Sequence, residues 1–467
     1  MMKRNSEEHL KIWIKKRRRK PLVLRGARQV GKSTLVRMFA EKNGWTLNEI
    51  NLERHLYLDD IFKTLDMDNI IRELEGLISA DIRKPDSILF LDEIQATPHA
   101  LGALRYFYED TPEIPVIAAG SLLEFTLSDH TFSMPVGRVE YYHLGPLTFK
   151  EWLHEIEPGL LKYIVSFDFS NKIPETAHKR LLEKQREYFF TGGMPEAVAA
   201  FKENRSLAEA SDVHRSIVET YLDDFSKYSR QVNLPLMQKV FRHIPLSLGK
   251  KVKYSHIARD KKSGEVKKAI DLLVNARVCH KVFHSHCNGV PLEAELNEKI
   301  YKLIFMDIGM VNHICGNDWT TIASFEKGRL VNEGGLGEQF IGQHIISLKN
   351  KAPALCYWLR EGKSVNAEVD YVISVGSDLF PIEVKSGKSG SLKSLHQFVL
   401  NKKRETAIRF DLNPPSREDI NYIADTGKGR VAVPCQLISL PLYMVEETAR
   451  ILAVDAARRS LSDSGWE

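Results

Sequence analysis

Short apolar runs alternate with helical periodicities in the first third of the chain. The runs at residues 21–25, 87–91 and 115–120 have the length of buried strands, and polar or glycine-rich residues follow each of them. After the first run, Leu35 and Phe39 recur at helical spacing. Strands and helices that alternate in this way predict a parallel sheet with its ligand at the carboxyl ends of the strands.

A different pattern lies in the middle of the chain, after a mainly helical stretch at 206–248. Residues 254–257 and 266–274 have short helical periodicities, and a polar turn at 261–265 separates them. Residues 278–283 then alternate between apolar and polar side chains, as strands do. Helix, turn, helix and strand in this order predict a winged helix-turn-helix.

The last third predicts another α/β domain. A helix that begins near Gly337 places Glu338, Ile341 and Ile345 on one face, so that a carboxylate points inward with apolar residues. A carboxylate rarely faces a core without a partner or a metal. Strands are expected downstream at 354–359, 367–373 and 379–385, and a helix at 392–400.

Composition narrows the class of protein. The chain has 467 residues, of which 43% are hydrophobic and 27% are charged, as in globular proteins of about three domains. No apolar run approaches the roughly 18 residues of a membrane span, and the charged N-terminus lacks the apolar core of a signal peptide. Five scattered cysteines without CxxC spacing indicate neither a disulfide framework nor a zinc site. We therefore expect a soluble, cytoplasmic protein.

The net charge of +5 is unevenly distributed along the chain. Residues 1–20 and residues 249–281 each carry a net charge of +7, which leaves −9 for the remainder. Two basic segments on an otherwise acidic chain predict a polyanionic partner, and DNA is the partner that we expect. For the first segment, the alternative is a solvated helix end over Lys15 to Lys20.

The glycine-rich stretch after the first strand has the P-loop pattern GxxxxGKS between a strand and a helix. Gly26 and Gly31 allow a loop whose backbone N–H groups point at one phosphate, and the helix N-terminus favours negative charge. Lys32 supplies a full charge for the β- and γ-phosphates of ATP, and Ser33 supplies a hydroxyl for Mg²⁺. The predicted ATP-binding residues are Gly26, Ala27, Arg28, Gln29, Val30, Gly31, Lys32, Ser33 and Thr34.

Two later strand ends supply further residues that an ATPase needs. Asp92 directly follows the run at 87–91 and can hold Mg²⁺ together with Ser33, while Glu93 can orient or deprotonate the attacking water. Ser121 follows the strand at 115–120 and is a candidate sensor of the γ-phosphate. A helix N-cap is the alternative for Ser121.

The C-terminal carboxylates form a second candidate site. Glu383 and Lys385 are two residues apart on a strand, so they project from the same face. Asp370 and Glu383 would hold one or two Mg²⁺ or Mn²⁺ ions. Lys385 would position the attacking water, and Glu338 would complete the site. A buried network of ion pairs, with Lys385 on Asp370 or Glu383, is the alternative without a metal.

Five lysines of the middle region are the predicted DNA contacts. Lys267 and Lys268 lie near the start of the second helix of the predicted winged helix, where residues normally face a groove. Lysines there contact phosphates and give affinity without sequence choice. The alternative is a module that binds protein. The other three lysines precede the first helix: Lys250, Lys251 and Lys253.

The motifs in this order resemble a known family. They are GARQVGKS, FLDEIQ, AAGSLLEF, the Gly137-Arg138 pair, GPLTFKE and GGMPE. Together they are similar to prokaryotic AAA-type ATPases (AAA_14-like) that carry a C-terminal DUF4143 domain. The resemblance implies that Arg138 is an arginine finger or sensor arginine, which acts in cis or on a neighbouring subunit of a homo-oligomer. The C-terminal carboxylates with Lys385 resemble the core of the PD-(D/E)xK nuclease superfamily.

The expected fold class is α/β, with a P-loop AAA-type parallel sheet and helical lid, a winged helix-turn-helix, and a restriction-endonuclease-like domain. The leading hypothesis is an ATP-hydrolysing enzyme coupled to a DNA-binding, metal-dependent nuclease-like domain. The alternative is an ATP-switched regulatory or binding protein that cleaves nothing and recognises DNA or a protein partner. The expected segments are 1–135 (ATPase core), 136–205 (lid), 206–330 (helices and winged helix), 331–440 (nuclease-like domain) and 441–467 (helical tail, a candidate docking site for a protein).

Overall fold

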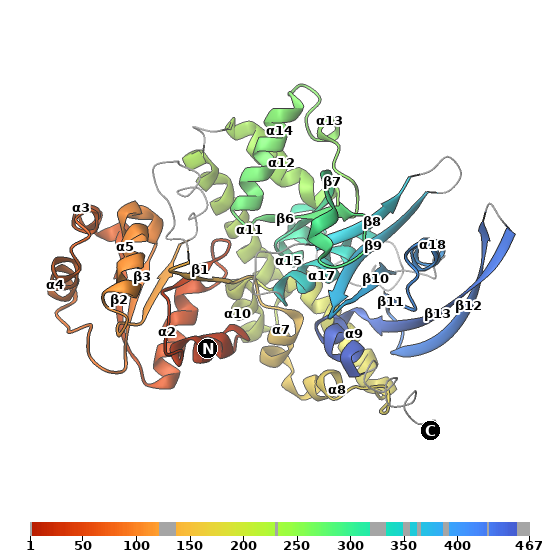
Figure 1. Ribbon diagram of the computed structural model, residues 1–467, viewed down its shortest axis with the longest axis horizontal. Coiled ribbons are helices and arrows are strands. Elements are labelled where there is room, and N and C mark those ends of the chain that lie inside the picture. The colour runs from red at the N-terminus through yellow and green to blue at the C-terminus, as the bar shows by residue number, and fades with distance from the viewer. Residues whose placement is uncertain are drawn as a thin grey trace. The chain divides into compact units, whose positions relative to one another are not determined.

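The chain folds into two compact units, which are described separately. The first consists of Met1–Leu147 with Asp271–Val278, and the second contains most of the remainder (Figure 1). The computed structural model describes residues 2–120, 137–228, 232–317, 333–348, 355–361, 366–385, 392–426 and 429–454.

A parallel sheet of five strands forms the centre of the described part of the first unit, in the order β2-β3-β4-β1-β5. All four strand pairs within it are parallel. The strands predicted at 21–25, 87–91 and 115–120 are present as β1, β3 and β4, which confirms the predicted parallel sheet. The strand bounds are Leu22–Arg25 (β1), Thr46–Asn51 (β2), Ser87–Asp92 (β3), Val116–Ala119 (β4) and Glu140–His143 (β5).

Helices surround this sheet, and their ends follow from local sequence signals. Gly44 ends α2 with φ +71°, the left-handed conformation that commonly terminates a helix. Pro98 occupies the first turn of α5, where its missing N–H costs nothing. The helices are α1 (Ser6–Ile14), α2 (Lys32–Asn43), α3 (Leu58–Lys63), α4 (Met67–Ile78) and α5 (Pro98–Glu109).

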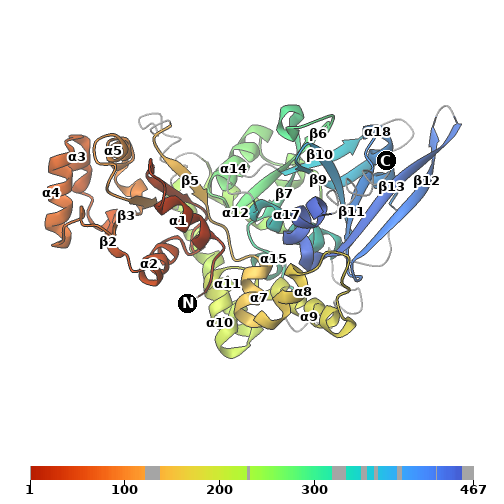
Figure 2. The same ribbon diagram turned by 60° about the horizontal axis from the view of Figure 1, so that its bottom comes forward.

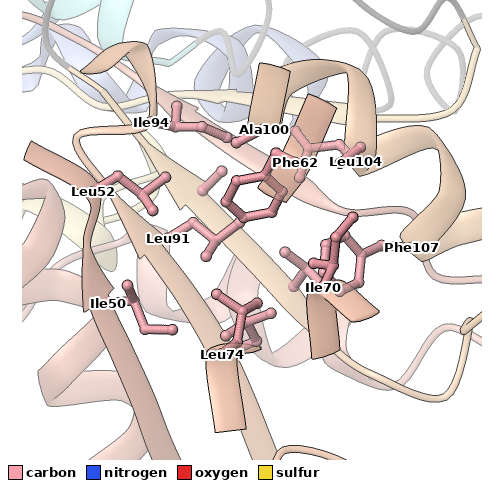
Figure 3. Packing of buried hydrophobic residues seen from close by; sticks show 14 of the residues in the cluster. Ile50, Leu52, Phe62, Ile70, Leu74, Leu91, Ile94, Ala100, Leu104 and Phe107 are labelled. Carbon is pink, nitrogen blue, oxygen red and sulfur yellow. The ribbon is translucent and has the colours of Figure 1, made fainter. Parts of the chain in front are cut away.

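An apolar core joins α3, α4 and α5 to the β2 and β3 side of the sheet (Figure 3). Phe62, Leu74 and Phe107 project from the three helices, and Ile50 and Leu91 face them from the strands. All five side chains are at most 2% exposed. Burial of each such side chain stabilises the fold by about 1.5–3 kcal/mol. This core therefore fixes β3, whose carboxyl end enters the nucleotide site.

The second unit begins with a helical region. Thr148 and Glu151 form a capping box at the start of α7, in which each side chain accepts the backbone N–H of the other residue. The helices of this region are α7 (Phe149–Ile156), α8 (Leu161–Val165), α9 (Glu175–Thr191), α10 (Pro195–Asn204), α11 (Leu207–Asp224), α12 (Leu234–Leu246), α13 (Tyr254–Ile257) and α14 (Ser263–Asn275), whose last residues are assigned to the first unit.

A mixed sheet of eight strands follows in the described residues, in the order β12-β13-β11-β10-β9-β8-β6-β7. Strand β6 pairs with β7 in antiparallel and with β8 in parallel orientation, so the strands after α14 and the C-terminal strands share one sheet. The hairpin β12–β13 extends beyond the rest of the sheet in both views (Figures 1 and 2). The strands are β6 (Cys279–Ser285), β7 (Leu296–Phe305), β8 (Leu355–Arg360), β9 (Ala367–Val375), β10 (Asp378–Val384), β11 (Thr406–Asp411), β12 (Ser416–Thr426) and β13 (Gly429–Pro441).

The remaining helices are α15 (Ile308–Ile314), α17 (Glu333–Ser347) and α18 (Lys393–Lys402). Helix α17 begins at Glu333, earlier than the start predicted near Gly337. Its first turn contains Gly335, on which a Cβ atom would lie 3.1 Å from the Cβ atom of Leu248. Gly335 is therefore explained by the close approach of Leu248, and it lies inside the helix rather than before its start.

The predicted helical tail begins with the 3₁₀ helix η7 (Leu442–Glu447) and continues as a helix to residue 454. All six side chains of η7 are buried. This part of the tail is therefore not a free docking surface for a protein partner, and residues 455–467 lie outside the described part of the chain. Among the described helices, none is long and apolar enough to cross a membrane.

Candidate functional site

The P-loop connects β1 to α2, and two of its positions require glycine for different reasons. A Cβ atom on Gly26 would lie 2.1 Å from the carbonyl oxygen of Leu144, so only glycine fits there. Gly31 has φ +89° and precedes the first residue of α2. This left-handed conformation suits glycine and lets the loop turn directly into the helix N-terminus. The loop therefore has the shape that anion binding requires.

Lys32 is the charged group of the loop and is only 8% exposed. Its Nζ atom donates hydrogen bonds to the carbonyl oxygens of Gly26 (3.1 Å) and Ala27 (2.9 Å). Burial lowers the pKa of Lys32 to about 8, although the carboxylates of Glu93 and Asp92 act in the opposite direction. A buried ammonium with two neutral acceptors gains strongly from an additional anion, such as a phosphate.

Ser33, at the start of α2, and Asp92, at the end of β3, are in contact. The Ser33 hydroxyl donates a hydrogen bond of 2.7 Å to Asp92 Oδ2. Burial raises the pKa of Asp92, while the hydrogen bond from Ser33 lowers it. A hydroxyl and a carboxylate oxygen side by side are hard ligands of the kind that Mg²⁺ prefers. These two residues therefore fit a Mg²⁺ ion that also binds the phosphates of ATP.

Glu93 is held by a residue that is not among those predicted from the sequence. Gln95 Nε2 donates a hydrogen bond of 2.5 Å to Glu93 Oε2, and Glu93 itself has φ +52°. A Cβ atom on Gly120 would lie 2.3 Å from Gln95 Oε1, so Gly120 makes room for this side chain. Gln95 belongs to the FLDEIQ motif, which was the available signal. The predicted sensor, Ser121, lies outside the described residues.

Arg4 braces the P-loop from the N-terminal segment. Its guanidinium donates to the carbonyl oxygen of Val30 at 3.1 Å and to that of Gly145 at 2.7 Å. In the sequence, Arg4 counted only toward the basic charge of residues 1–20. Gln29 of the predicted loop has φ +63°, which is a left-handed backbone conformation. Arg28 and Thr34 are the two other predicted loop residues.

Arg138 lies at the opposite end of the sheet from the P-loop. Strands β5 and β1 are parallel, with Glu140 beside Leu22 and His143 beside Arg25. Arg138 therefore precedes the amino end of β5, roughly 20 Å along the strand direction from the loop. Its Nε atom donates a hydrogen bond of 2.5 Å to Glu109. In this arrangement Arg138 lies far from the P-loop of its own chain, and its role as an arginine finger or sensor stays a prediction.

The predicted C-terminal carboxylates come together in the second unit, around a lysine. Lys302 of β7 has its Nζ atom 3.2 Å from Glu338 of α17, 2.5 Å from Glu368 of β9 and 3.9 Å from Asp370 of β9. Lys302 is 2% exposed. Neither Lys302 nor Glu368 is among the residues predicted from the sequence. A lysine within the apolar run of β7 could have indicated a buried ion pair.

The other side of this acid cluster contains the predicted Glu-x-Lys pair. Lys385 Nζ lies 2.6 Å from Glu383 Oε1, and Asp370 Oδ2 accepts a hydrogen bond of 2.8 Å from the backbone N–H of Val384. The four predicted residues thus meet at one place, and the ion-pair alternative holds for Lys385 with Glu383. We use the name acid cluster for Glu338, Glu368, Asp370 and Glu383 with Lys302 and Lys385.

Burial and mutual repulsion shape the charges of the acid cluster. Burial raises the pKa of Glu338 to about 8 and that of Glu383 to about 7, and the charge of Asp370 adds to both shifts. For Lys302, burial opposes the charged form, but the neighbouring carboxylates outweigh it and raise the pKa. Lys302 is therefore an ammonium at neutral pH.

The acid cluster does not fit the second Mg²⁺ or Mn²⁺ ion expected at Asp370 and Glu383. Throughout the described residues, no three His, Cys, Asp or Glu side chains have the arrangement of a metal site. One physical reason is Lys302, whose ammonium already binds Glu338 and Glu368 and lies 3.9 Å from Asp370, one of the two expected ligands. A cation bound there would meet a like charge in a buried environment.

The predicted DNA-contacting lysines differ in their surroundings. Lys250, Lys253, Lys267 and Lys268 are exposed. Lys251 is half-buried and forms an ion pair with Glu361. Three further basic side chains between these lysines are exposed and increase the positive charge: Arg259, Lys261 and Lys262.

Three protein families match successive parts of the chain. Residues 18–153 match an AAA domain (AAA_14). Residues 182–321 match a domain of unknown function, DUF8612, and residues 333–434 match another, DUF4143. None of the curated proteins matches the chain.

Solved structures with a similar course of the chain include two prokaryotic proteins. The Walker-type ATPase PABY2304 of Pyrococcus abyssi is 15% identical, with a TM-score of 0.43, and the match covers 68% of this chain and 96% of that one. The RuvB Holliday junction branch migration motor of Thermotoga maritima is 15% identical, with a TM-score of 0.28, and the match covers 60% of this chain and 90% of that one.

Proposed function

We propose that this chain, an AAA-family ATPase followed by two domains of unknown function, binds and hydrolyses Mg²⁺–ATP to switch the DNA binding of its second unit. The hydrogen bond between Ser33 and Asp92 beside the buried Lys32 is the observation that carries the ATPase part. It brings the metal ligands and the phosphate-binding charge of a P-loop enzyme into one site. The exposed lysines of the second unit support the DNA-binding part.

Each residue of the nucleotide site has a role in this proposal. The backbone N–H groups of the P-loop and Lys32 bind the phosphates, and Ser33 with Asp92 holds Mg²⁺, which neutralises charge on the β- and γ-phosphates. Glu93 orients or deprotonates the attacking water, and Gln95 holds its carboxylate in place. Ser121 contacts the γ-phosphate as a sensor.

Arg138 acts in trans in this proposal, on the nucleotide of a neighbouring copy. Its position at the amino end of β5 supports this choice over a role in cis. A homo-oligomer is then the active form, because the arginine that stabilises transition-state charge comes from the next subunit.

The second unit binds DNA without cleaving it in this proposal. The order α12, α13, α14, β6 and β7 supports a winged helix, whose exposed Lys267 and Lys268 contact phosphates. The meeting of Glu338, Asp370, Glu383 and Lys385 supports a PD-(D/E)xK-like fold for the C-terminal strands. The ammonium of Lys302 among the carboxylates favours the form that does not cut.

The ATPase is tested with the full chain and Lys32→Ala. We expect this change to abolish ATP binding and hydrolysis, because the phosphates lose their buried charge. Lys42→Ala is the matched control, since Lys42 lies on the same helix α2 but forms an ion pair with Glu7. Normal hydrolysis by Lys32→Ala would refute the assignment of the site.

Cleavage is tested directly, because the carboxylates meet Lys385 as the nuclease resemblance implies, although Lys302 lies beside them. Plasmid and single-stranded DNA are incubated with Mg²⁺ or Mn²⁺, with and without ATP, and with wild type, Lys385→Ala and Asp370→Ala. Cutting by the wild type that both changes abolish establishes the nuclease. Intact ATP hydrolysis with no cutting supports the proposal of a binding domain.

A further inference from the structure

We infer that Lys302 is the resident cation of the acid cluster, where its ammonium takes the place of a divalent metal ion, and that its removal creates a metal site. The inference deepens the proposed non-cleaving role of the second unit and does not depend on ATP hydrolysis. It concerns the carboxylates of Glu338, Glu368 and Asp370.

The position of the ammonium is the first argument. Lys302 Nζ lies within 4 Å of carboxylate oxygens from three residues, one on helix α17 and two on strand β9, which β6 and β8 separate from β7 in the sheet. The side chain is only 3% exposed, so the carboxylates rather than water provide most of the surroundings of the charge. The three carboxylates surround the ammonium at ion-pair distances, so a divalent ion in its place would have to draw their oxygens closer.

The walls of the acid cluster are the second argument. A Cβ atom on Gly249 would lie 2.7 Å from Glu338 Oε1, and one on Gly342 would lie 2.4 Å from the hydroxyl of Tyr371. That hydroxyl donates a hydrogen bond of 2.8 Å to the carbonyl oxygen of Glu338. Mg²⁺ retains several water ligands when it binds proteins. Such tight walls favour exchange of the ammonium for an ion over the addition of an ion beside it.

The charge balance is the third argument. Without Lys302, Lys385 is the remaining cation of the acid cluster, and it is already bound to Glu383. Glu338, Glu368 and Asp370 would then face one another without a compensating charge in a half-buried place. Proton uptake or a divalent cation relieves such repulsion. Carboxylate oxygens select Mg²⁺ or Mn²⁺ as that cation.

The experiment replaces Lys302 by methionine in the full chain. Methionine has a similar unbranched shape and keeps the packing against Tyr357, whose ring centroid lies 5.1 Å from Nζ. All variants also carry Asp92→Asn, so that the nucleotide site lacks the carboxylate assigned to Mg²⁺. Mn²⁺ binding is measured by electron paramagnetic resonance, and thermal unfolding is followed with and without Mn²⁺.

We expect Lys302→Met to bind one Mn²⁺ at least about tenfold more tightly than the parent chain and to gain about 5 °C or more in Tm when Mn²⁺ is added. Lys385→Met is the matched control, because it removes the same charge from the same cluster but leaves Lys302 in place. It should show neither effect. Asp370→Asn added to Lys302→Met should abolish the gain and thereby locate the ion.

Two results would overturn the inference. One is a folded Lys302→Met chain without Mn²⁺-dependent stabilisation, and the other is Mn²⁺ binding by the parent chain that Asp370→Asn abolishes. If Lys302→Met does not fold alone, Lys302→Gln, which still donates hydrogen bonds to Glu368, is tested in the same way. If the wild-type chain does not hydrolyse ATP, the proposed ATPase is refuted, but the Mn²⁺-binding results remain valid.

Discussion

Two of the buried lysines in the described part of the chain, Lys32 and Lys302, have partners that give them opposite properties. Lys32 faces neutral carbonyl oxygens, and burial lowers its pKa. Lys302 faces three carboxylates, which raise its pKa despite burial. Among the described residues, Lys32 therefore lacks a carboxylate partner of its own and can bind an anionic ligand, while the charge of Lys302 is neutralised by carboxylates of the same chain. Burial alone therefore does not distinguish a binding lysine from a structural one; the charge of its neighbours does.

At the residue scale, Gln95 is a positioning residue for Glu93. We expect Gln95→Leu to reduce kcat for ATP hydrolysis about tenfold to a hundredfold, because the carboxylate loses the hydrogen bond that orients it. The KM for ATP should remain close to that of the wild type, since Gln95 does not contact the P-loop. Steady-state kinetics separate the two parameters. A raised KM with unchanged kcat would contradict this role.

At the element scale, the start of α7 is fastened to α17. The backbone N–H of Phe149 donates a hydrogen bond of 2.8 Å to His344 Nε2, and His344 Nδ1 is 2.7 Å from the carbonyl oxygen of Phe340. The next N–H, that of Lys150, donates to Glu446 at 2.8 Å. Side chains from two distant segments thus satisfy the free N–H groups of a helix N-terminus. The GPLTFKE motif therefore has a structural role where it enters the second unit.

His344 makes stability depend on pH. Burial lowers its pKa from the ordinary 6.5 to about 4, so the folded state holds it neutral while the unfolded chain takes up a proton below pH 6.5. The contribution of His344 is therefore complete above pH 6.5 and is lost as the pH falls toward 4, by about 3 kcal/mol in total. Urea unfolding at pH 7 and pH 5 should show a smaller acid-side loss for His344→Gln than for wild type. Equal losses would exclude His344 as the cause.

The exposed lysines at the start of α14 give a prediction for DNA binding. Lys267→Glu with Lys268→Glu should weaken binding and reduce the slope of log affinity against log salt by about 2, since each neutralised phosphate contributes about 0.9. Fluorescence anisotropy at several salt concentrations measures both. Lys251→Gln is the control with a small expected effect, because Lys251 is paired with Glu361. If the double change alters neither the affinity nor its salt dependence, α14 is not part of the DNA interface.

Local signals predicted the elements of the nucleotide site, whereas the acid cluster depends on pairings between distant segments. The P-loop and the strand before Asp92 are contiguous patterns, so spacing alone identified them. Lys302 and Glu368 lie on β7 and β9, which β6 and β8 separate in the sheet. No periodicity within either strand indicates that the two side chains meet. The pairing of β6 with β8 is equally invisible in a single sequence, because more than sixty residues separate the two strands.

At the scale of the whole molecule, a short piece of chain connects the nucleotide site to the acid cluster. Arg4 ties the P-loop at Val30 to Gly145 within the first unit. The chain enters the second unit at Thr148, and Phe149 is bonded to His344 on α17, the helix that also carries Glu338. If the proposed switch operates, these residues are the covalent and hydrogen-bonded connection along which it would act.

Arg4→Ala tests this route and depends on the proposed function. We expect the variant to hydrolyse ATP at a rate within about threefold of wild type, while the ATP-dependent change in DNA affinity is lost, since coupling energies are typically 1–3 kcal/mol. Arg18→Ala is the control from the same basic segment, because Arg18 is exposed. Unchanged coupling in Arg4→Ala would show that the signal takes another path.

The shared eight-stranded sheet means that the family boundaries are not boundaries of folding. A fragment that begins at residue 333, where the DUF4143 match starts, lacks β6 and β7 and so leaves the edge of β8 unpaired. It also loses Lys302, so the acids of α17 and β9 would lack their counter-charge. An open apolar edge promotes aggregation. The two matched domains therefore depend on each other for folding, and we expect the second one to be insoluble when it is expressed alone.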